Sequence, residues 1–352
     1  MLRFAELLRD IYNADSTVKV VHPSPFFGSL GFLPLPVRKY LAYIDKLLIF
    51  PVRLLFIVHS YDRIHIADHS NAFYSFFSPP GRCLVTCHDL LAVRAAFGDS
   101  TTACEASPIG IWLQRLIMAG LRRADAIAFV SQATFRDFQQ LIGSPSGQRH
   151  SVIPNPPNAP FTPDLAVFPI SASEAALIPS QPFLLMVGSS LPRKNRDLAL
   201  RLLNLLGSDS PYRLVFAGDP LTEAEQSFRL THPQGQRLVS IPHPGHALLN
   251  RLYGLAHALL FPSFSEGFGW PVLEAQICHC PVIASTTTSI PEVAGPGALF
   301  ADPSDEAGFA VHVIALEDPS VRSRLIHRGL ENSRRYDAES IALAYRMFAF
   351  QP

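Results

Sequence analysis

Short apolar runs alternate with longer stretches of helical periodicity along almost the whole sequence. Apolar runs of this kind are typical of strands that are buried on both faces of a parallel sheet. Strands that alternate with helices build parallel sheets with helices packed on both faces. At 352 residues, the chain is too long for one such unit and suits two. The alternation therefore predicts an α/β protein with two doubly wound, Rossmann-like domains.

The expected strands form two groups along the chain. They are 18–22, 63–67, 82–87, 125–130 and 150–153 in the first group, and 183–187, 212–217, 237–241, 257–261 and 281–284 in the second. Ser131 is a suitable N-cap for a helix over 132–141, which Gly143 would end. A further helix is expected over 195–205.

A proline-rich segment separates the two groups. It contains Pro154, Pro156, Pro157, Pro160 and Pro163. Because proline fits neither a helix interior nor a central strand, the segment is predicted to be a stiff connector. We expect a first domain at 1–160 and a second at 161–336. The last helix, 337–352, either packs on the second domain or crosses back to the first.

The chain opens on an amphipathic helix over 2–11, with no strand before it. A doubly wound domain normally begins with a central strand and a glycine-rich turn into its first helix. The first strand and the glycine loop of the first domain are therefore expected to be missing.

Charge and cysteine content narrow the classes of function. Lysine and arginine number 29, as do aspartate and glutamate. This balance gives no basic stripe for a nucleic acid. The five cysteines are an odd number, and no signal peptide precedes them, which argues against a secreted disulfide framework. Cys278-His279-Cys280 lacks a second ligand pair, so we interpret it as core packing and expect no metal site.

No segment is predicted to span a membrane. The most apolar candidate, 40–59, contains Asp45, Lys46, Pro51 and Arg53. Within it, residues 38–57 suit either a helix packed on its own domain, which we favour, or a peripheral contact with a membrane surface.

The segment 265–275 carries the strongest chemical pattern. It follows an expected strand at 257–261, and ligands bind beyond the carboxyl ends of strands in open α/β sheets. Gly267 and Gly269 allow a tight turn and a close approach to a ligand. Pro271 suits the first turn of a new helix, whose free N–H groups would face an anion. Glu266 and Glu274 flank this cradle, with Glu274 expected in the first helical turn, and suit recognition of sugar hydroxyls.

A second turn of the same kind follows the strand at 183–187. It begins at Gly188 and contains Arg193 and Lys194, which is the only lysine beyond residue 46. A point charge beside a forked donor is the pair expected opposite a diphosphate. In the first domain, His88 follows the strand at 82–87 and is expected to face the cleft between the domains.

These residues resemble a known family. Glu266-Gly267-Phe268-Gly269 through Glu274 is similar to the E-x7-E signature of glycosyltransferase family 4, which contains retaining enzymes of the glycosyltransferase B fold. Pro192-Arg193-Lys194-Asn195 resembles the phosphate-binding stretch of its mannosyltransferase-like members, and Val85 to Leu90 their histidine loop. The resemblance covers nearly the whole chain and implies two domains that face each other across a cleft.

The resemblance implies a metal-independent hexosyltransferase that needs no cofactor. Glu266 would contact donor-sugar hydroxyls, with backbone N–H groups near Phe268 and Gly269 holding the sugar or the diphosphate. Glu274 would bind the ribose. Lys194, helped by Arg193 beside Gly188, would neutralise the leaving diphosphate, and His88 would lie near the sugar.

The donor would be a nucleoside-diphosphate sugar, with a lean toward GDP-mannose. The acceptor would be a glycan or a lipid-linked saccharide. The enzyme would act in the cytoplasm or at the inner face of the membrane.

The family's first strand and glycine loop would precede the helix that begins at Leu2. Their absence suggests an upstream start codon or a truncated copy, and it leaves a catalytically inactive nucleotide-sugar-binding relative or partner subunit as the alternative. A dinucleotide dehydrogenase is disfavoured because no G-x-G-x-x-G follows the first strand. A phosphorylase would need pyridoxal phosphate on Lys194, the lysine already assigned to the diphosphate.

Overall fold

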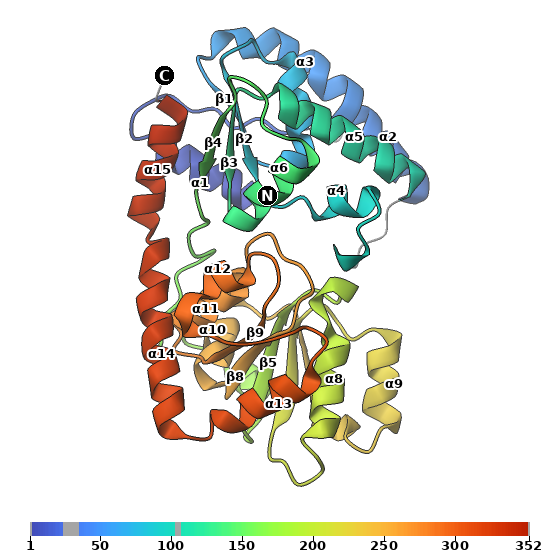
Figure 1. The fold of residues 1–352 in the computed structure, drawn as a ribbon, viewed down its shortest axis with the longest axis vertical. Coiled ribbons are helices and arrows are strands. Elements are labelled where there is room, and N and C mark those ends of the chain that lie inside the picture. Colours follow the sequence, from blue (N-terminus) through green and yellow to red (C-terminus); the bar gives the residue numbers. More distant parts are fainter. Residues whose placement is uncertain (1, 24–34, 103–106, 351–352) are drawn as a thin grey trace.

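The computed structural model describes residues 2–23, 35–102 and 107–350, which form two α/β domains (Figure 1). The strands of the first domain are β1 (Ile64–Ile66), β2 (Cys83–Cys87), β3 (Ala126–Phe129) and β4 (Arg149–Val152). Its helices are α1 (Leu2–Tyr12), α2 (Leu35–Ile44), α3 (Phe50–Ile57), α4 (Leu91–Ala96), α5 (Pro108–Arg123) and α6 (Gln132–Leu141). A π-helical turn, Asp45–Ile49, joins α2 to α3.

The second domain follows residues 153–164, which contain no helix or strand. Its strands are β5 (Phe183–Gly188), β6 (Arg213–Gly218), β7 (Leu238–Pro242), β8 (Ala258–Phe261), β9 (Val282–Ser285) and β10 (Leu299–Ala301). Its helices are α7 (Ala172–Ala175), α8 (Arg196–Leu205), α9 (Glu223–Thr231), α10 (His246–Leu255), α11 (Trp270–Ile277), α12 (Ile290–Ala294), α13 (Glu306–Ala315) and α14 (Pro319–Ser333), followed by α15 (Ala338–Phe350).

Both sheets are parallel, as the alternation predicts, but their strand orders differ. The second sheet runs β10-β9-β8-β5-β6-β7, so its order reverses between β5 and β8, as in a doubly wound fold. The first sheet runs β1-β2-β3-β4 in sequence order and has no such reversal among the described residues. The physical reason is that the described residues before β1 supply helices and coil to this domain.

One predicted strand is absent from the structure, and one observed strand was not predicted. The segment 18–22 forms no strand, and Lys19 and His22 within it are exposed. Burial on both faces was the basis of that prediction, so it is wrong. The sequence pattern also missed β10, which has only three residues and is too short to show a period.

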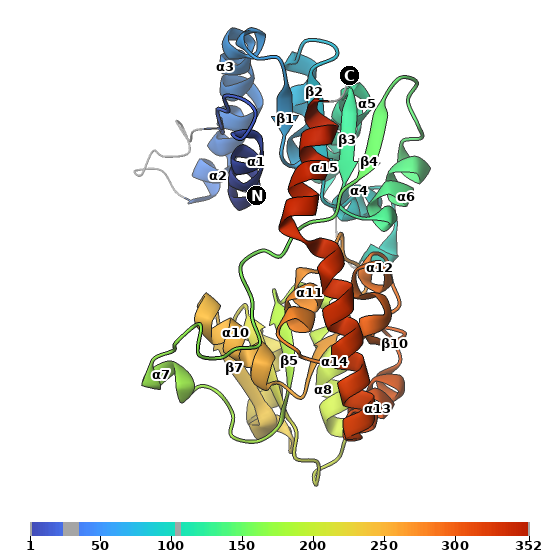
Figure 2. The ribbon, with the colours of Figure 1, turned by 90° about the vertical axis from the view of Figure 1, so that its left-hand side faces the viewer.

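The first sheet is covered by different helices on its two faces. Val85 and Ile127 pack toward α3, α5 and α6, whereas Leu84 and Ala126 pack toward α1 and α15. Figure 2 shows α14 on the second domain and α15 continuing up to the first. Arg63 donates a hydrogen bond to the Ala349 carbonyl at 3.1 Å, which fastens the end of α15 beside β1. The last helix therefore crosses back to the first domain.

The cysteines of the second domain lie where packing residues belong. Cys278 and Cys280 are buried among the apolar side chains of α10, α11, β8 and β9. Throughout the part of the chain that the structure describes, no helix is long and apolar enough to cross a membrane. In the same residues, no cluster of His, Cys, Asp or Glu side chains could hold a metal ion.

Candidate functional site

The strand reversal of the second domain places two loops side by side. One follows β5 and leads into α8, and the other follows β8 and leads into α11. The carboxyl ends of the two strands at such a reversal are where open α/β sheets bind their ligands. Apart from Glu274, the loops hold the residues that the sequence singled out in this domain, from Gly188 to Lys194 and from Glu266 to Gly269.

The loop after β5 is shaped by two residues with positive φ. Gly188 ends the strand at φ +125°, and Asn195 adopts φ 57° before α8 begins. The Asn195 amide donates to the Pro262 carbonyl at 3.1 Å and to the Pro303 carbonyl at 2.7 Å. The Phe264 N–H donates to the Arg193 carbonyl at 2.8 Å. The bonds to Pro262 and from Phe264 join the loop after β5 to the loop after β8.

Three charged side chains meet between the loops. Lys194 Nζ lies 2.7 Å from Glu266 Oε1, and Arg193 donates to Glu266 Oε2 at 2.6 Å. The carboxylate is 8% exposed and the lysine 12%, so water screens these pairs weakly. The cluster holds two cations and one anion, and it can therefore receive further negative charge.

Electrostatics within this cluster favour ionised Glu266. Burial opposes ionisation, but the attraction of Lys194 and Arg193 outweighs it and lowers the pKa of Glu266. Burial, with the nearby Arg193 charge, lowers the pKa of Lys194 despite the opposing carboxylate. A diphosphate placed here would add negative charge beside Lys194 and thereby favour its charged form.

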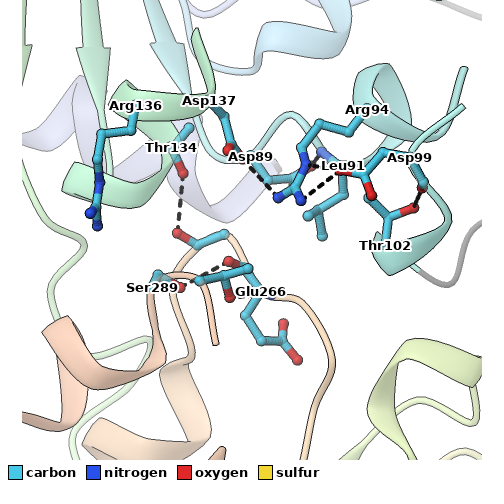
Figure 3. Close-up of polar contacts among 12 residues, drawn as sticks. Asp89, Leu91, Arg94, Asp99, Thr102, Thr134, Arg136, Asp137, Glu266 and Ser289 are labelled. Carbon is cyan, nitrogen blue, oxygen red and sulfur yellow. Dashed lines mark hydrogen bonds and ion pairs between the residues drawn. The ribbon is translucent and has the colours of Figure 1, made fainter. Parts of the chain in front are cut away.

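Backbone contacts fix the Glu266 loop. The Glu266 N–H donates to Thr288 Oγ1 at 3.0 Å. The Ser289 hydroxyl lies 2.9 Å from the Glu266 carbonyl, to which it donates (Figure 3), and 3.0 Å from the Phe268 carbonyl. Gly269, at φ +110°, precedes α11, and Pro271 lies in its first turn as predicted. Thr288 and Ser289 escaped the sequence reasoning because their link to the loop depends on tertiary packing.

The same loop contacts the first domain. Ser131 Oγ donates to the Gly267 carbonyl at 2.9 Å. Thr134 Oγ1 also donates to that oxygen, at 3.3 Å (Figure 3). Beside it, the Glu292 carboxylate accepts from the Gln132 N–H at 2.9 Å. Ser131 is the predicted N-cap of α6, and its hydroxyl also accepts from the Thr134 N–H. The start of α6 therefore holds the two domains together beside the site.

Gly267 lies against the His88 loop of the first domain. A Cβ at Gly267 would lie 2.1 Å from the His88 carbonyl oxygen and 2.6 Å from Asp89 Cβ. Only glycine allows the two loops to approach this closely, since real Cβ contacts do not fall below 3.0 Å. The close approach joins the histidine loop to the glutamate loop across the domain boundary.

We expect Gly267→Ala to separate the two loops while both domains stay folded. A displacement of about 1 Å at a reacting centre can lower turnover by up to about 10²-fold. Small-angle scattering should show a larger radius of gyration, and sugar transfer should fall. Gly245→Ala is the matched control, because its nearest neighbour would be Glu174 Oε1 at 3.9 Å. A variant with unchanged dimensions and turnover would contradict this role.

The His88 side chain points away from this contact. Its Nε2 lies 3.0 Å from the Ala67 carbonyl, to which it donates, and the Phe4 ring packs edge-on at 4.6 Å. Burial, with repulsion from His69, lowers the pKa of His88. The backbone of His88 thus meets the glutamate loop, whereas its imidazole packs between β1 and α1.

Two polar residues beside His88 were not singled out from the sequence. The His88 N–H donates to His69 Nδ1 at 3.4 Å, and His69 Nε2 lies 4.0 Å from Asp89 Oδ1. A usable signal was present, since Asp68-His69 follows β1 just as His88-Asp89 follows β2. Carboxyl ends of adjacent parallel strands meet at one edge of the sheet, which brings the two pairs together.

Glu274 lies deeper than expected. It is the fifth residue of α11 and not part of the first turn, so the predicted position is one turn too early. The Tyr253 hydroxyl donates to Glu274 Oε2 at 2.9 Å, and the residue is 5% exposed. Burial raises the pKa of Glu274 to about 7 despite the hydrogen bond from Tyr253. The prediction took the helix to start at Pro271, whereas α11 starts one residue earlier, at Trp270. The burial of Glu274 depends on tertiary packing, which the local pattern does not show.

This raised pKa predicts a pH-dependent stability. Between about pH 4.5 and 7, folded Glu274 holds a proton that the unfolded chain has lost, so stability falls as pH rises and levels off above the folded pKa. Across this range, the free energy of unfolding falls by roughly 3 kcal/mol because of Glu274. Urea denaturation across this range should therefore show a flatter profile for Glu274→Gln than for the wild type. Parallel profiles would contradict the raised pKa.

Comparisons with known proteins identify the family and the fold of this chain. The family described as "Glycosyl transferases group 1" matches residues 170–331, and "Glycosyltransferase Family 4" matches residues 7–159. The chain belongs to the group 1 glycosyltransferases. Its two parallel sheets with flanking helices form the glycosyltransferase B fold, as the resemblance predicts.

Several relatives and solved structures are similar to this glycosyltransferase. The O-antigen chain mannosyltransferase B of Escherichia coli is 35% identical over 166 residues, which cover 46% of this chain and 43% of the relative. The D-inositol 3-phosphate glycosyltransferase of Acidothermus cellulolyticus is 32% identical over 168 residues, which cover 43% of this chain and 37% of the relative. The match thus spans less than half the length of these curated relatives.

The solved structures show the fold alone. WaaG, a glycosyltransferase involved in lipopolysaccharide biosynthesis, superposes with a TM-score of 0.69 at 13% identity over 100% of this chain and 96% of WaaG. HepE from Anabaena, solved with UDP and glucose, superposes with a TM-score of 0.64 at 19% identity over 86% of this chain and 81% of HepE.

Proposed function

We propose that this group 1 glycosyltransferase is a retaining hexosyltransferase that uses a nucleoside-diphosphate sugar. The observation that carries the proposal is the buried cluster of Glu266 with Lys194 and Arg193 at the strand reversal. Two fixed cations and a carboxylate suit a ligand that presents a diphosphate beside sugar hydroxyls.

In the proposed reaction, the bond from the sugar's anomeric carbon to the diphosphate breaks. The acceptor hydroxyl forms a new bond to that carbon on the same face, and its proton passes to the departing phosphate oxygen. Lys194 and Arg193 stabilise the charge that develops on the diphosphate, so this step needs no divalent metal. Glu266 accepts hydrogen bonds from donor-sugar hydroxyls, which orients the anomeric carbon.

The names of the relatives support one kind of donor and acceptor. Similarity to O-antigen mannosyltransferases supports mannose as the sugar and a glycan or lipid-linked saccharide as the acceptor. The place of action would be the cytoplasm, at the inner face of a membrane. In this site, Glu274 is poised one turn into α11 to bind the ribose once it is ionised.

The test is product analysis with GDP-mannose, UDP-glucose and an oligosaccharide acceptor. We expect the product linkage to keep the donor's anomeric configuration, as nuclear magnetic resonance would show, and Glu266→Gln to abolish most of the product. An inverted linkage would overturn the retaining assignment. Donor binding without any product, with every acceptor tried, would favour the alternative of a binding relative.

A further inference from the structure

The helices α2 and α3 have an apolar surface where a surface helix normally carries charges. Outward-facing side chains of this run include Leu48, 62% exposed, and Phe56, 80% exposed. Asp45, its one acidic residue, is instead buried at 3% exposure. An amphipathic helix in water has the opposite arrangement. Figures 1 and 2 show this run on the outside of the first domain.

Helix α5 extends the apolar surface. Tyr43, Leu48, Phe76 and Trp112 belong to a group of apolar side chains from α2, the π-helical turn, α5 and residues 73–77 that surround a hollow of about 440 Å³. Trp112 is 55% exposed at its rim. We call the exposed side chains of α2–α3 and α5, together with this hollow, the apolar face. Exposed apolar surface of this extent marks an interaction site.

The helices that carry the apolar face are basic, which indicates its partner. Leu35–Ile57 and Pro108–Arg123 contain seven basic residues and a single acidic one, the buried Asp45, in a chain whose net charge is zero. Arg53 and Arg115 are exposed beside the apolar side chains. Aromatic and aliphatic groups edged by arginine suit the boundary between acyl chains and anionic headgroups. A lipid surface offers one continuous layer of acyl chains to both Phe56 and Trp112, which a soluble protein does not.

We propose that the apolar face docks this glycosyltransferase on an anionic lipid surface. Leu48, Phe56 and Trp112 enter the acyl boundary, while Arg53 and Arg115 bind lipid phosphates. The proposal goes beyond sugar transfer and holds whichever donor the second domain uses. Docking through the first domain would leave the donor loops of the second domain, at the end of β5 and β8, open to water.

The experiment is co-sedimentation of the full chain with vesicles of phosphatidylcholine alone or with added phosphatidylglycerol. We expect binding to the anionic vesicles and a blue shift of Trp112 emission, which Trp112→Phe removes. Phe56→Ser should weaken binding by about tenfold or more, and Arg53→Gln by roughly fivefold. Leu230→Ser, at a 75% exposed position on α9, is the matched control and should bind as the wild type does.

Three results would overturn the proposal. They are equal sedimentation with both kinds of vesicle, binding that Phe56→Ser leaves unchanged, and a dimer in light scattering that Phe56→Ser converts to a monomer. The last would assign the apolar face to a second copy of the chain. Thermal stabilisation by GDP-mannose or UDP-glucose should persist in Phe56→Ser, so a failure of docking is distinguishable from a failure of the donor site.

Discussion

Lys194→Met is expected to lower the turnover number for sugar transfer by about 10²–10³-fold, the loss typical of removing one group that stabilises a developing charge. The lysine side chain is only 12% exposed, and its ammonium lies 2.7 Å from Glu266 and 5.1 Å from the centre of the Phe261 ring, so water cannot easily replace it. Steady-state assays of nucleoside diphosphate release with a saturating donor would measure the effect.

Two controls separate this effect from unfolding. Lys19→Met removes an exposed lysine and should retain full turnover. Thermal denaturation of Lys194→Met should still show a folded protein, in which Glu266 keeps its bond to Arg193. A folded Lys194→Met protein within about threefold of wild-type turnover, far less than removal of such a group normally costs, would exclude Lys194 from leaving-group stabilisation.

Arg196→Met is expected to have the largest effect on stability, a loss of about 3–5 kcal/mol. Arg196 and Glu225 are both 5% exposed and lie 3.3 Å apart. The guanidinium also donates to the carbonyls of Gly188 and Asp219 at 3.1 Å. Removing the guanidinium leaves the buried Glu225 carboxylate without its cation. It also removes the hydrogen bonds that link the carboxyl ends of β5 and β6.

Urea denaturation would measure this loss, and Arg201→Met is its matched control. Arg201 lies on the same helix, but its pair with Glu306 is half exposed, so the change should cost less than about 1 kcal/mol. The double variant Arg196→Met/Glu225→Gln should recover part of the loss, because the unpaired charge is then absent. If Arg196→Met and Arg201→Met destabilise equally, the buried pair does not stabilise the fold.

Local patterns in the sequence were enough to predict much of this fold. The buried strands of the second domain, the N-cap at Ser131 and the helix start at Pro271 depend on residues close in sequence. Features that depend on distant packing could not be predicted in this way. The three residues of β10 form a strand by pairing with β9, whereas the segment 18–22 forms no strand.

The site shows the same division between local and distant signals. Glycines and charges marked the two loops of the second domain, because turn chemistry is local. The sequence assigned Gly267 to a close approach of a ligand, whereas in the structure its space is taken by the His88 loop. The contacts of Ser131 with Gly267 and of Glu292 with Gln132 also require the relative placement of the domains. Spacing along the chain carries no information about that placement.

The central claim is that the loops after β5 and β8 form one site for a nucleoside diphosphate. Calorimetric titration of the full chain with GDP and with UDP tests it most directly. The account predicts that one of them binds at a single site, and that Lys194→Met weakens this binding by about 10- to 100-fold through loss of a charge-assisted bond. Equal affinity in the wild type and Lys194→Met, or no binding of either nucleotide, would contradict it.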